Sequence, residues 1–508
     1  MSTKSLLFLF FCILSFSSYS QISVLPDNKK ICYTGRIAFD DPLNPSFSMS
    51  ATGIKINFEG TKVDGRFSSQ GGSSFVYIII DGVYTPYDRK ILELNNVNES
   101  LYTLVDNLPE GKHTLELIKL NESDTKITFH GFVIEGQGLT TKPKRPVLQL
   151  EFIGDSNTAG WAAWDAYDKG GNEASGSFYT FPGITSRMLN AEYSLIGASS
   201  SGVADRATWN LTKFYNRIHL KDKMSSINTW DFSNNYWNFE PQAVIINLGA
   251  NDHYPKTPKK EIKAAWKQFI TNQIRVYYPN THIVLANSYG WSYGEPADYV
   301  HEVINELKAK GDDNVSFVKF PWLWGQSHAV VNEHAGFANI LALHLSKELN
   351  LPTPELSPLS SMGQHGELKN GSFEHSILPG IADGWRPHGK NQLITSQKDA
   401  FKGTRFMRLT DGGWVNFATP VSTGTTLNLK AYMRGFQDNA TGYLKIVFKD
   451  QGQKTIKTQQ IRPDINKEWT AYETSVDVPK GVWSAWVIIE ADEDSEIDFD
   501  AVSLKVSK

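Results

Sequence analysis

A chain of 508 residues is too long for one hydrophobic core, so its length predicts two to four domains. Hydrophobic residues make up 40% and charged residues 20%, which is the composition of ordinary globular proteins. The formal net charge of −4 excludes the strong basic field on which nucleic-acid binding depends.

The first 20 residues have the pattern of a secretory leader. Lys4 precedes the apolar stretch Leu6–Phe16, and Ser18-Tyr19-Ser20 provides small residues for cleavage. An uncleaved membrane anchor is the alternative, but this apolar stretch is short for a bilayer span. The leader predicts a protein that is secreted, periplasmic or held at the cell surface, cleaved near Ser20 and without stable membrane insertion.

The cysteines limit the chemistry of the chain. Cys12 falls in the leader, so Cys32 is the one cysteine left after cleavage. An intramolecular disulfide is therefore excluded, and neither a zinc cluster nor a thiol mechanism has enough cysteines.

Residues 21–145 carry the pattern of an all-β domain. Apolar and polar residues alternate along 53–58. The stretch 75–80 is a stronger strand closed by a turn at Asp81-Gly82, and another turn leads into 113–118. Short strands with regular turns indicate a β-sandwich or jelly roll. The segment 142–146, rich in lysine and proline, is the expected linker.

Residues 146–350 change to an alternation of strands and helices. The predicted strands are short and apolar, and the predicted helices carry apolar residues at helical spacing. In chain order they are the strands 148–153, 243–248 and 282–286 and the helices 262–277 and 335–349. This alternation predicts a parallel sheet with helices on both faces, an α/β/α domain.

The segment 351–365 is rich in proline and serine and predicts a second linker. Residues 366–508 return to short alternating strands, such as 443–448 and 486–490. The whole chain is thus expected to be multidomain, with a β-sandwich, an α/β/α domain and a C-terminal β-sandwich in that order.

The junction Gly154–Ala159 follows the predicted strand 148–153 directly. Gly154 permits a sharp turn, which places Ser156 at the carboxyl end of a parallel strand, where such sheets bind ligands. A serine hydroxyl is a weak nucleophile unless a base and oxyanion donors converge on it. Ser156 is therefore a candidate nucleophile, with a helix N-cap as the alternative.

Two further segments offer oxyanion donors at predicted strand ends. Gly202 lies in a serine-rich loop, and Asn251 follows the strand 243–248 closely. The backbone N–H groups of Ser156 and Gly202 and the side-chain amide of Asn251 are expected to form an oxyanion hole. A plain turn glycine and an asparagine that bonds its own loop are the alternatives.

A resemblance to a known family rests on four blocks in order. They are Gly154-Asp155-Ser156, then Gly202, then Gly249-Ala250-Asn251-Asp252, then a histidine before the last helix. This order resembles the SGNH (GDSL-type) hydrolase superfamily. The segments 76–82 and 106–115 narrow the resemblance to carbohydrate esterase family 2, in which a β-sandwich precedes the SGNH domain. Over residues 30–350 it implies an SGNH hydrolase that deacylates sugars without a cofactor.

Under this resemblance the base is a histidine, and His328 and His334 compete for the role. Asn332 is a good N-cap, which leaves His328 in the loop before the helix and favours it. His334 is the alternative base. The family has an aspartate two or three residues before this histidine, and neither candidate has one. Ser-His dyads without this aspartate are known in the family that the chain resembles; in them a backbone carbonyl or an amide must hold the imidazole. A remote carboxylate, Glu333, is the other candidate to take the place of the aspartate.

Aromatic residues occur close to the site segments and suit the faces of sugar rings. The substrate-binding candidates are Trp161, Tyr289, Trp291 and Trp324. The alternative for each of them is a position in the hydrophobic core.

The ends of the C-terminal domain, 368–374 and 497–504, resemble carbohydrate-binding modules of the jelly-roll type. This resemblance implies polysaccharide targeting and leaves room for a structural calcium ion. A sandwich that only packs on the central domain is the alternative. The candidate sugar platforms are Trp385, Trp414, Trp483 and Trp486, and strand alternation alone is expected to bury about half of them.

The sequence thus predicts a secreted serine carboxylic-ester hydrolase, similar to acetylxylan esterases. Its expected reaction removes O-acetyl groups from a polysaccharide or oligosaccharide through a Ser-His acyl-enzyme route. No catalytic metal, no cofactor and no nucleic-acid partner are expected. A GDSL-type lipase or thioesterase and a catalytically inactive glycan-binding surface protein are the alternatives. The polysaccharide, the acyl position and the oligomeric state stay open.

Overall fold

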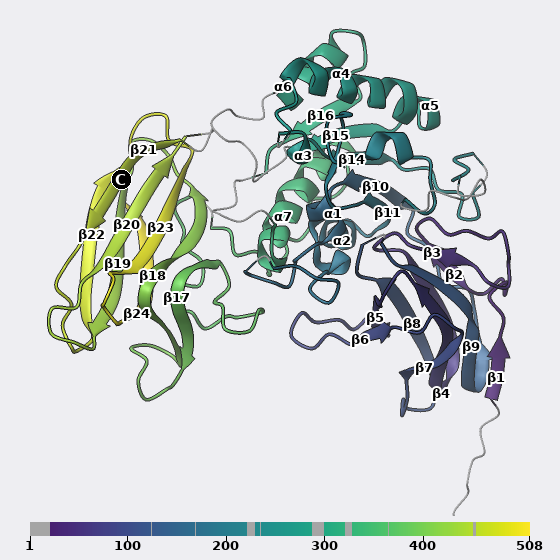
Figure 1. Cartoon of the computed structure of the whole chain (residues 1–508), viewed down its shortest axis with the longest axis horizontal. Helices are drawn as coiled ribbons and strands as arrows, with labels where there is room; N and C mark the ends of the chain where they lie inside the picture. Colours follow the sequence, from purple (N-terminus) through teal and green to yellow (C-terminus); the bar gives the residue numbers. More distant parts are fainter. Residues whose placement is uncertain are drawn as a thin grey trace, which may run out of the picture.

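The computed structural model describes residues 21–122, 124–167, 169–220, 229–233, 235–253, 255–286, 299–320, 328–363, 365–450 and 454–507. They form three domains, and the central one lies between the two β-rich domains (Figure 1). The predicted leader lies outside these residues. Within them, no helix has the length and apolarity that crossing a bilayer requires.

The N-terminal domain consists of nine antiparallel strands. They are β1 (Gln21–Val24), β2 (Cys32–Thr34), β3 (Ser46–Phe47), β4 (Gly53–Gln70), β5 (Ser74–Ile80), β6 (Ile91–Leu94), β7 (Ser100–Val105), β8 (Lys112–Lys119) and β9 (Lys126–Leu139). The long β4 pairs with β8 through Gly53–Glu59 and with β7 through Val63–Phe67. This change of partner along one strand folds the sheet around a single apolar core.

A five-stranded parallel sheet forms the centre of the middle domain, in the order β11-β10-β14-β15-β16. The strands are β10 (Leu148–Gly154), β11 (Ala191–Gly197), β14 (Ala243–Asn247), β15 (His282–Ala286) and β16 (Val315–Val318). The short β12 (Ser201–Gly202) and β13 (Trp209–Asn210) pair beside it. The strands predicted at 148–153, 243–248 and 282–286 are confirmed.

Helices cover both faces of this sheet. They are α1 (Ser156–Ala159), α2 (Phe181–Met188), α3 (Ala250–His253), α4 (Lys259–Phe269), α5 (Arg275–Tyr277), α6 (Tyr299–Lys308) and α7 (Val331–Glu348), with a π-helical stretch at Ile270–Ile274. Side chains alternate along β10, so Phe152 packs in the cluster of α2 and α7 and Ile153 in that of α4 and α6. This three-layer arrangement confirms the predicted α/β/α domain.

The predicted start of the last helix is wrong by a few residues. The helix α7 begins at Val331, so Asn332 lies inside its first turn and is not the N-cap. The side chain of Glu333 accepts the backbone N–H of Val330 at 2.9 Å and closes the helix start instead. His328 precedes the helix, as the prediction required, and His334 lies within it.

The C-terminal domain is an antiparallel β-sandwich, as predicted. Its strands are β17 (Trp385–Thr395), β18 (Arg405–Pro420), β19 (Thr426–Gly435), β20 (Gly442–Lys449), β21 (Thr455–Ile461), β22 (Thr470–Asp477), β23 (Ser484–Ala491) and β24 (Ile497–Ser507). Val447 and Trp486 join the hydrophobic cluster of α2 and α7, while Ala166 and Val330 join the cluster of the C-terminal core. The two domains therefore share apolar packing.

A buried ion pair joins the N-terminal and central domains. Arg36 Nη2 lies 3.2 Å from Glu151 Oε1 on strand β10 of the central domain, and the two side chains are 1% and 0% exposed. The hydroxyl of Tyr215 also donates to Glu151. Because charges this deeply buried must be paired, the contact fixes how the two domains meet.

Candidate active site

Ser156 lies at the turn between β10 and α1. Asp155 is the N-cap of α1, and its Oδ1 accepts the backbone N–H of Asn157 at 3.0 Å. A side chain at position 154 would not fit, because a Cβ on Gly154 would stand 1.9 Å from Thr158 Oγ1. The tight turn places Ser156, 5% exposed, at the carboxyl end of the strand.

Three neighbouring strands end at the same level of the sheet. Gly154 of β10 is in register with Gly197 of β11 on one side and with Asn247 of β14 on the other. The chain therefore leaves all three strands along one edge, with β10 in the middle. The segments that follow carry Ser156, Gly202 and Asn251, so the topology brings their loops together.

His328 meets Ser156 directly. Its Nε2 lies 2.8 Å from Ser156 Oγ, although 172 positions separate the two residues in the chain. The next backbone N–H, that of Ala329, donates to Asn157 Oδ1 at 2.9 Å. The turn that presents the hydroxyl thus also holds the loop that presents the imidazole.

His334 lies away from this pair. It is fully buried in α7, its Nδ1 accepts the backbone N–H of Phe181 at 3.3 Å, and its ring stacks on the Phe181 ring. Burial lowers the pKa of His334 to about 3, so the ring is neutral at physiological pH. Its contacts are those of a structural histidine in the core.

The oxyanion candidates sit on a well-supported loop. Asp252 is fully buried and accepts the backbone N–H groups of Val203 at 2.9 Å and Ala204 at 2.8 Å. A Cβ on Gly202 would come within 2.6 Å of Asp252 Oδ2, so this position accepts only glycine without rearrangement. Asn251 Nδ2 donates to Ser201 O at 3.0 Å, and an amide nitrogen carries a second N–H for another acceptor.

The N-terminal domain contributes to the same loop. Glu122, 1% exposed, accepts the backbone N–H of Ser199 at 2.9 Å and its hydroxyl at 2.5 Å. Ser199 lies between the end of β11 and Gly202. Sequence analysis missed this contact, because nothing in the local pattern around Glu122 indicates its partner 77 residues away.

Asp155 is buried beside Ser156, and this burial raises its pKa from 3.8 to about 7. The hydrogen bond from Asn157 N and the nearby His328 oppose the rise. The protonated carboxyl of Asp155 therefore stabilises the folded protein fully below about pH 4, and this stabilisation is lost as pH rises through about 7. The reason is that the unfolded chain already releases the proton near the ordinary pKa of 3.8.

We expect Asp155→Asn to stabilise the protein relative to the wild type increasingly from pH 5 to pH 8, by up to about 4 kcal/mol. Asparagine stays neutral and keeps the oxygen that caps α1. Thermal unfolding of both proteins at pH 5, 6, 7 and 8 measures the effect. Parallel curves for the two proteins would contradict it.

The aromatic candidates divide into described and undescribed residues. Trp161 is half-buried, and its backbone N–H donates to Ser156 O at 2.9 Å, directly after the turn of the nucleophile. Tyr289, Trp291 and Trp324 lie outside the described residues. Trp161 thus stays a candidate for substrate contact by its position.

The remote carboxylate Glu333 has other partners. Its oxygens accept the N–H of Val330 at 2.9 Å and two N–H groups of Arg386 at 2.8 and 2.7 Å. Glu333 therefore supports the helix start and binds a guanidinium from the C-terminal domain, two contacts that sequence analysis did not predict.

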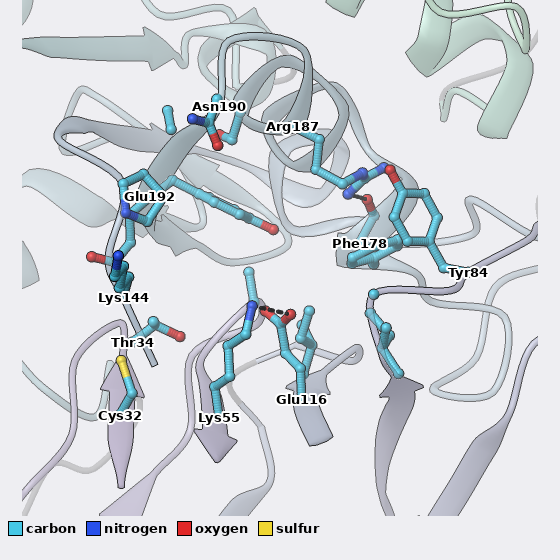
Figure 2. Close-up of a pocket in the computed structure, with 18 residues that line it drawn as sticks. Cys32, Thr34, Lys55, Tyr84, Glu116, Lys144, Phe178, Arg187, Asn190 and Glu192 are labelled. Carbon is cyan, nitrogen blue, oxygen red and sulfur yellow. Dashed lines mark hydrogen bonds and ion pairs between the residues drawn. The ribbon is translucent and has the colours of Figure 1, made fainter. Parts of the chain in front are cut away.

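A pocket of about 330 Å³ lies between the N-terminal and central domains, away from Ser156 (Figure 2). Lys55 and Glu116 form an ion pair on one wall, and Arg187 lies against the ring of Phe178 on another. The lining includes the first residues of β11, whereas Ser156 lies at the edge of the sheet where the strands end. This pocket is therefore separate from the Ser156–His328 pair.

In the described part of the chain, no group of three or more His, Cys, Asp or Glu side chains is placed to hold a metal ion. Near the strand ends of the C-terminal domain, Glu374 accepts the N–H groups of Thr404 and Arg405, and Asp500 accepts that of Lys402. These carboxylates have protein partners, and the structural calcium ion stays a prediction.

Three of the four tryptophans predicted as sugar platforms in the C-terminal domain are core residues. Trp385, Trp414 and Trp486 are 2%, 0% and 4% exposed, so this expectation is wrong for them. They fill the sandwich and its contact with the central domain.

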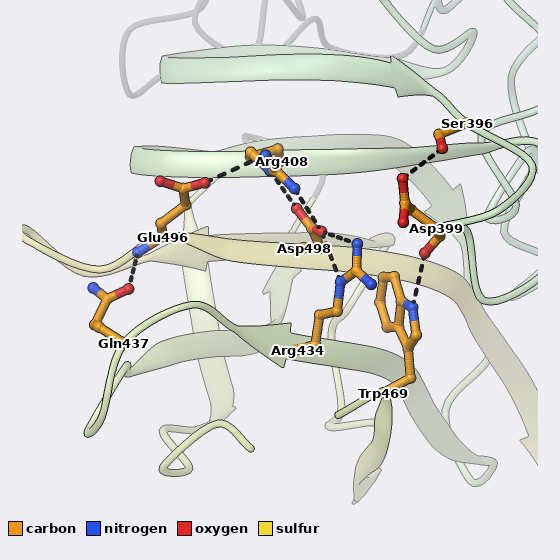
Figure 3. Close-up of polar contacts among 8 residues, drawn as sticks. All are labelled: Ser396, Asp399, Arg408, Arg434, Gln437, Trp469, Glu496 and Asp498. Carbon is orange, nitrogen blue, oxygen red and sulfur yellow. Dashed lines mark hydrogen bonds and ion pairs between the residues drawn. The ribbon is translucent and has the colours of Figure 1, made fainter. Parts of the chain in front are cut away.

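A different face of this domain gathers charged and aromatic groups (Figure 3). Asp498, fully buried, binds Arg408 at 2.7 Å and Arg434 at 2.8 Å. The guanidinium of Arg434 lies 4.8 Å from the ring centre of Trp469, and that of Arg408 lies 4.2 Å from Phe436. One carboxylate thus holds two planar cations against aromatic rings. Glycan binding by this domain stays a prediction.

Two families match the chain. Residues 33–143 match "Carbohydrate esterase 2 N-terminal", and residues 152–349 match "GDSL-like Lipase/Acylhydrolase family". Cellulase/esterase CelE of Acetivibrio thermocellus is 30% identical over 350 residues, which cover 64% of this chain and 39% of that protein. The chain thus spans well under half the length of this curated relative.

Solved structures of carbohydrate esterases are similar in fold to the first two domains of the chain. A family two carbohydrate esterase from Clostridium thermocellum, solved in complex with cellohexaose, is 29% identical to this chain, with a TM-score of 0.57. The match covers 63% of this chain and 99% of the esterase chain. An acetyl xylan esterase from Butyrivibrio proteoclasticus, at 21% identity and a TM-score of 0.56, covers 66% of this chain and 99% of its own and shows the fold. The chain therefore combines a carbohydrate esterase 2 N-terminal domain with a GDSL-like SGNH domain, the two parts found in its family 2 carbohydrate esterase homologues.

Proposed function

We propose that the chain is a secreted carbohydrate esterase that removes O-acetyl groups from a polysaccharide or oligosaccharide. The observation that carries the proposal is the 2.8 Å contact between His328 Nε2 and Ser156 Oγ at the carboxyl edge of the sheet. The similarity to family 2 carbohydrate esterases, one of them bound to cellohexaose, supports a carbohydrate substrate.

The first half of the proposed reaction forms an acyl-enzyme. Ser156 Oγ attacks the acyl carbonyl carbon while His328 Nε2 takes the hydroxyl proton. The negative charge on the carbonyl oxygen is held by the N–H groups of Ser156 and Gly202 and the amide of Asn251. When the ester bond breaks, the sugar oxygen leaves with the proton from His328.

Water completes the cycle. It attacks the acyl carbon of the Ser156 ester, His328 accepts one of its protons, and the same donors hold the second oxyanion. The acyl–serine bond then breaks, Ser156 Oγ regains a proton from His328, and the carboxylic acid departs. Each proton taken by the imidazole is returned, so the reaction requires no cofactor.

A substrate panel tests the proposed function. We expect the purified protein to hydrolyse an aryl acetate and to release acetate from an acetylated polysaccharide, and to cleave an aryl octanoate more slowly. Ser156→Ala is the control and is expected to lose all three activities. Preference for the octanoate would indicate the lipase or thioesterase, and polysaccharide binding without acetate release would indicate the inactive glycan-binding protein.

Asn251 is expected to contribute strongly to turnover, although less than the base. Because Asn251→Ala removes one oxyanion donor, kcat on the aryl acetate should fall by about 10²–10³-fold with little change in KM. Steady-state kinetics measures both values. The exposed Asn272 in the π-helical stretch provides a matched control, Asn272→Ala. A loss below about 3-fold in Asn251→Ala would remove its oxyanion role.

A further inference from the structure

An arginine of the C-terminal domain reaches the loop of His328. Arg386, on β17, donates from Nη2 to the carbonyl oxygen of His328 at 2.8 Å and from Nη1 to the carbonyl oxygen of Ala166 at 3.0 Å. Its Nε and Nη2 bind the two oxygens of Glu333 at 2.8 and 2.7 Å. One guanidinium thus binds the histidine loop, the segment after the nucleophile turn and the start of α7.

This contact is buried. The side chains of Arg386 and Glu333 are 4% and 3% exposed. Removing two charges from water is costly, and an apolar pair often packs with equal stability, so stability alone does not explain a buried ion pair. The planar guanidinium has five N–H donors in a fixed geometry, which suits it to hold several acceptors at set positions.

Successive backbone groups of the loop are held. The carbonyl oxygen of His328 accepts from Arg386, the N–H of Ala329 donates to Asn157 Oδ1, and the N–H of Val330 donates to Glu333 Oε2. Asn157 belongs to the same turn as Ser156. The backbone position of His328 is therefore set between the nucleophile turn on one side and the Arg386–Glu333 pair on the other.

We propose that Arg386 is a positioning residue for the reaction: by holding the His328 carbonyl and Glu333, it keeps the imidazole in contact with Ser156. The C-terminal domain thereby completes the active site of the central domain. The inference rests on the proposed function. It concerns a residue beyond the family matches, which end at residue 349.

The expected defect lies in turnover. A shift of about 1 Å in a reacting group can cost about 10²-fold in rate. In Arg386→Ala, we expect kcat on an aryl acetate to fall by about 10²-fold while KM stays within about 3-fold. Arg386→Lys keeps the charge but has three N–H donors for the four acceptors that Arg386 binds, so its loss is expected to be about 10-fold.

Arg408→Ala is the matched control in the full-length protein. Arg408 also binds a buried carboxylate, that of Asp498, and the partly exposed Glu496, but these contacts stay within the C-terminal domain. We expect this variant to lower the unfolding temperature of the domain and to keep kcat within about 2-fold of the wild type. Equal losses of kcat in Arg408→Ala and Arg386→Ala would overturn the inference, because domain instability would then explain both.

Rescue by added guanidinium ion separates positioning from misfolding. At low millimolar concentration the ion should occupy the space left in Arg386→Ala beside Glu333 and raise kcat at least 5-fold, with no effect on the wild type. If Arg386→Ala fails to fold, the loss of kcat in Arg386→Lys is compared with that in Arg408→Ala instead, and equal losses in these two variants would overturn the inference. Wild-type activity in either alanine or lysine variant would overturn the inference, whereas an inactive wild type would overturn the proposed function itself.

Discussion

Replacing His328 with alanine is expected to lower kcat on an aryl acetate by about 10⁴-fold or more, because Ser156 then has no group to take its proton. KM should change little, since the imidazole acts in the chemical step. Burst kinetics on a chromogenic acetate would show which half-reaction is lost, and both acylation and deacylation are expected to be slow. Activity within about 10-fold of the wild type would remove His328 from the mechanism.

His334→Ala is the matched control for this experiment. His334 is fully buried and packs on Phe181, so its loss is expected to cost stability, and the variant should keep kcat within a few-fold while its unfolding temperature falls. Near-UV circular dichroism and thermal unfolding separate the two effects. A loss of kcat in His334→Ala equal to that in His328→Ala, at full folding, would reverse the assignment.

Arg36→Ala is expected to destabilise the protein by about 3–5 kcal/mol. The substitution leaves Glu151, 0% exposed, as a buried carboxylate on β10 without its cationic partner. Urea unfolding followed by tryptophan fluorescence and by esterase activity measures the loss. Lys55→Ala, which breaks the partly exposed pair with Glu116, is the matched control and should cost under about 1 kcal/mol.

The pH dependence gives this prediction a second signature. Burial already raises the pKa of Glu151, and Arg36 opposes that rise. Without Arg36 the folded pKa rises further, so the carboxyl contributes stability at low pH that is lost as pH increases through the folded pKa. The variant should therefore lie closer to the wild type at acid pH than at pH 8. A loss independent of pH would contradict the role of Glu151 as the charge left behind.

Three strands of the central sheet and the position of Ser156 at their carboxyl ends could be predicted from the sequence, because both depend on local patterns. Short apolar runs such as 243–248 and 282–286 are too short for typical helices and favour buried strands, and the turn after Gly154 determines where Ser156 lies. The start of α7 was placed too late because Glu333 closes the helix from within its first turn, so the good capping residue Asn332 was not needed.

The contacts between domains could not be predicted in this way. Glu151 and Arg36 are 115 positions apart, and Arg386 and Glu333 are 53 positions apart, so no local spacing pairs them. A charged residue in a strand pattern also indicates a solvent-facing position, whereas Glu151 faces a neighbouring domain. The prediction for the C-terminal tryptophans was wrong for a different reason. Alternation shows which side chains share one face of a strand, but it does not show which face is buried.

The bond between Glu122 and Ser199 has a consequence for protein engineering. It anchors the loop before Gly202 to a carboxylate that belongs to another domain. A chimera that keeps the central domain but takes its N-terminal sandwich from a different source would need an acceptor at this same point. Exchange at the linker is thus constrained at Glu122 as well as at the Arg36–Glu151 pair, and a chimera library should be screened at positions 36 and 122 first.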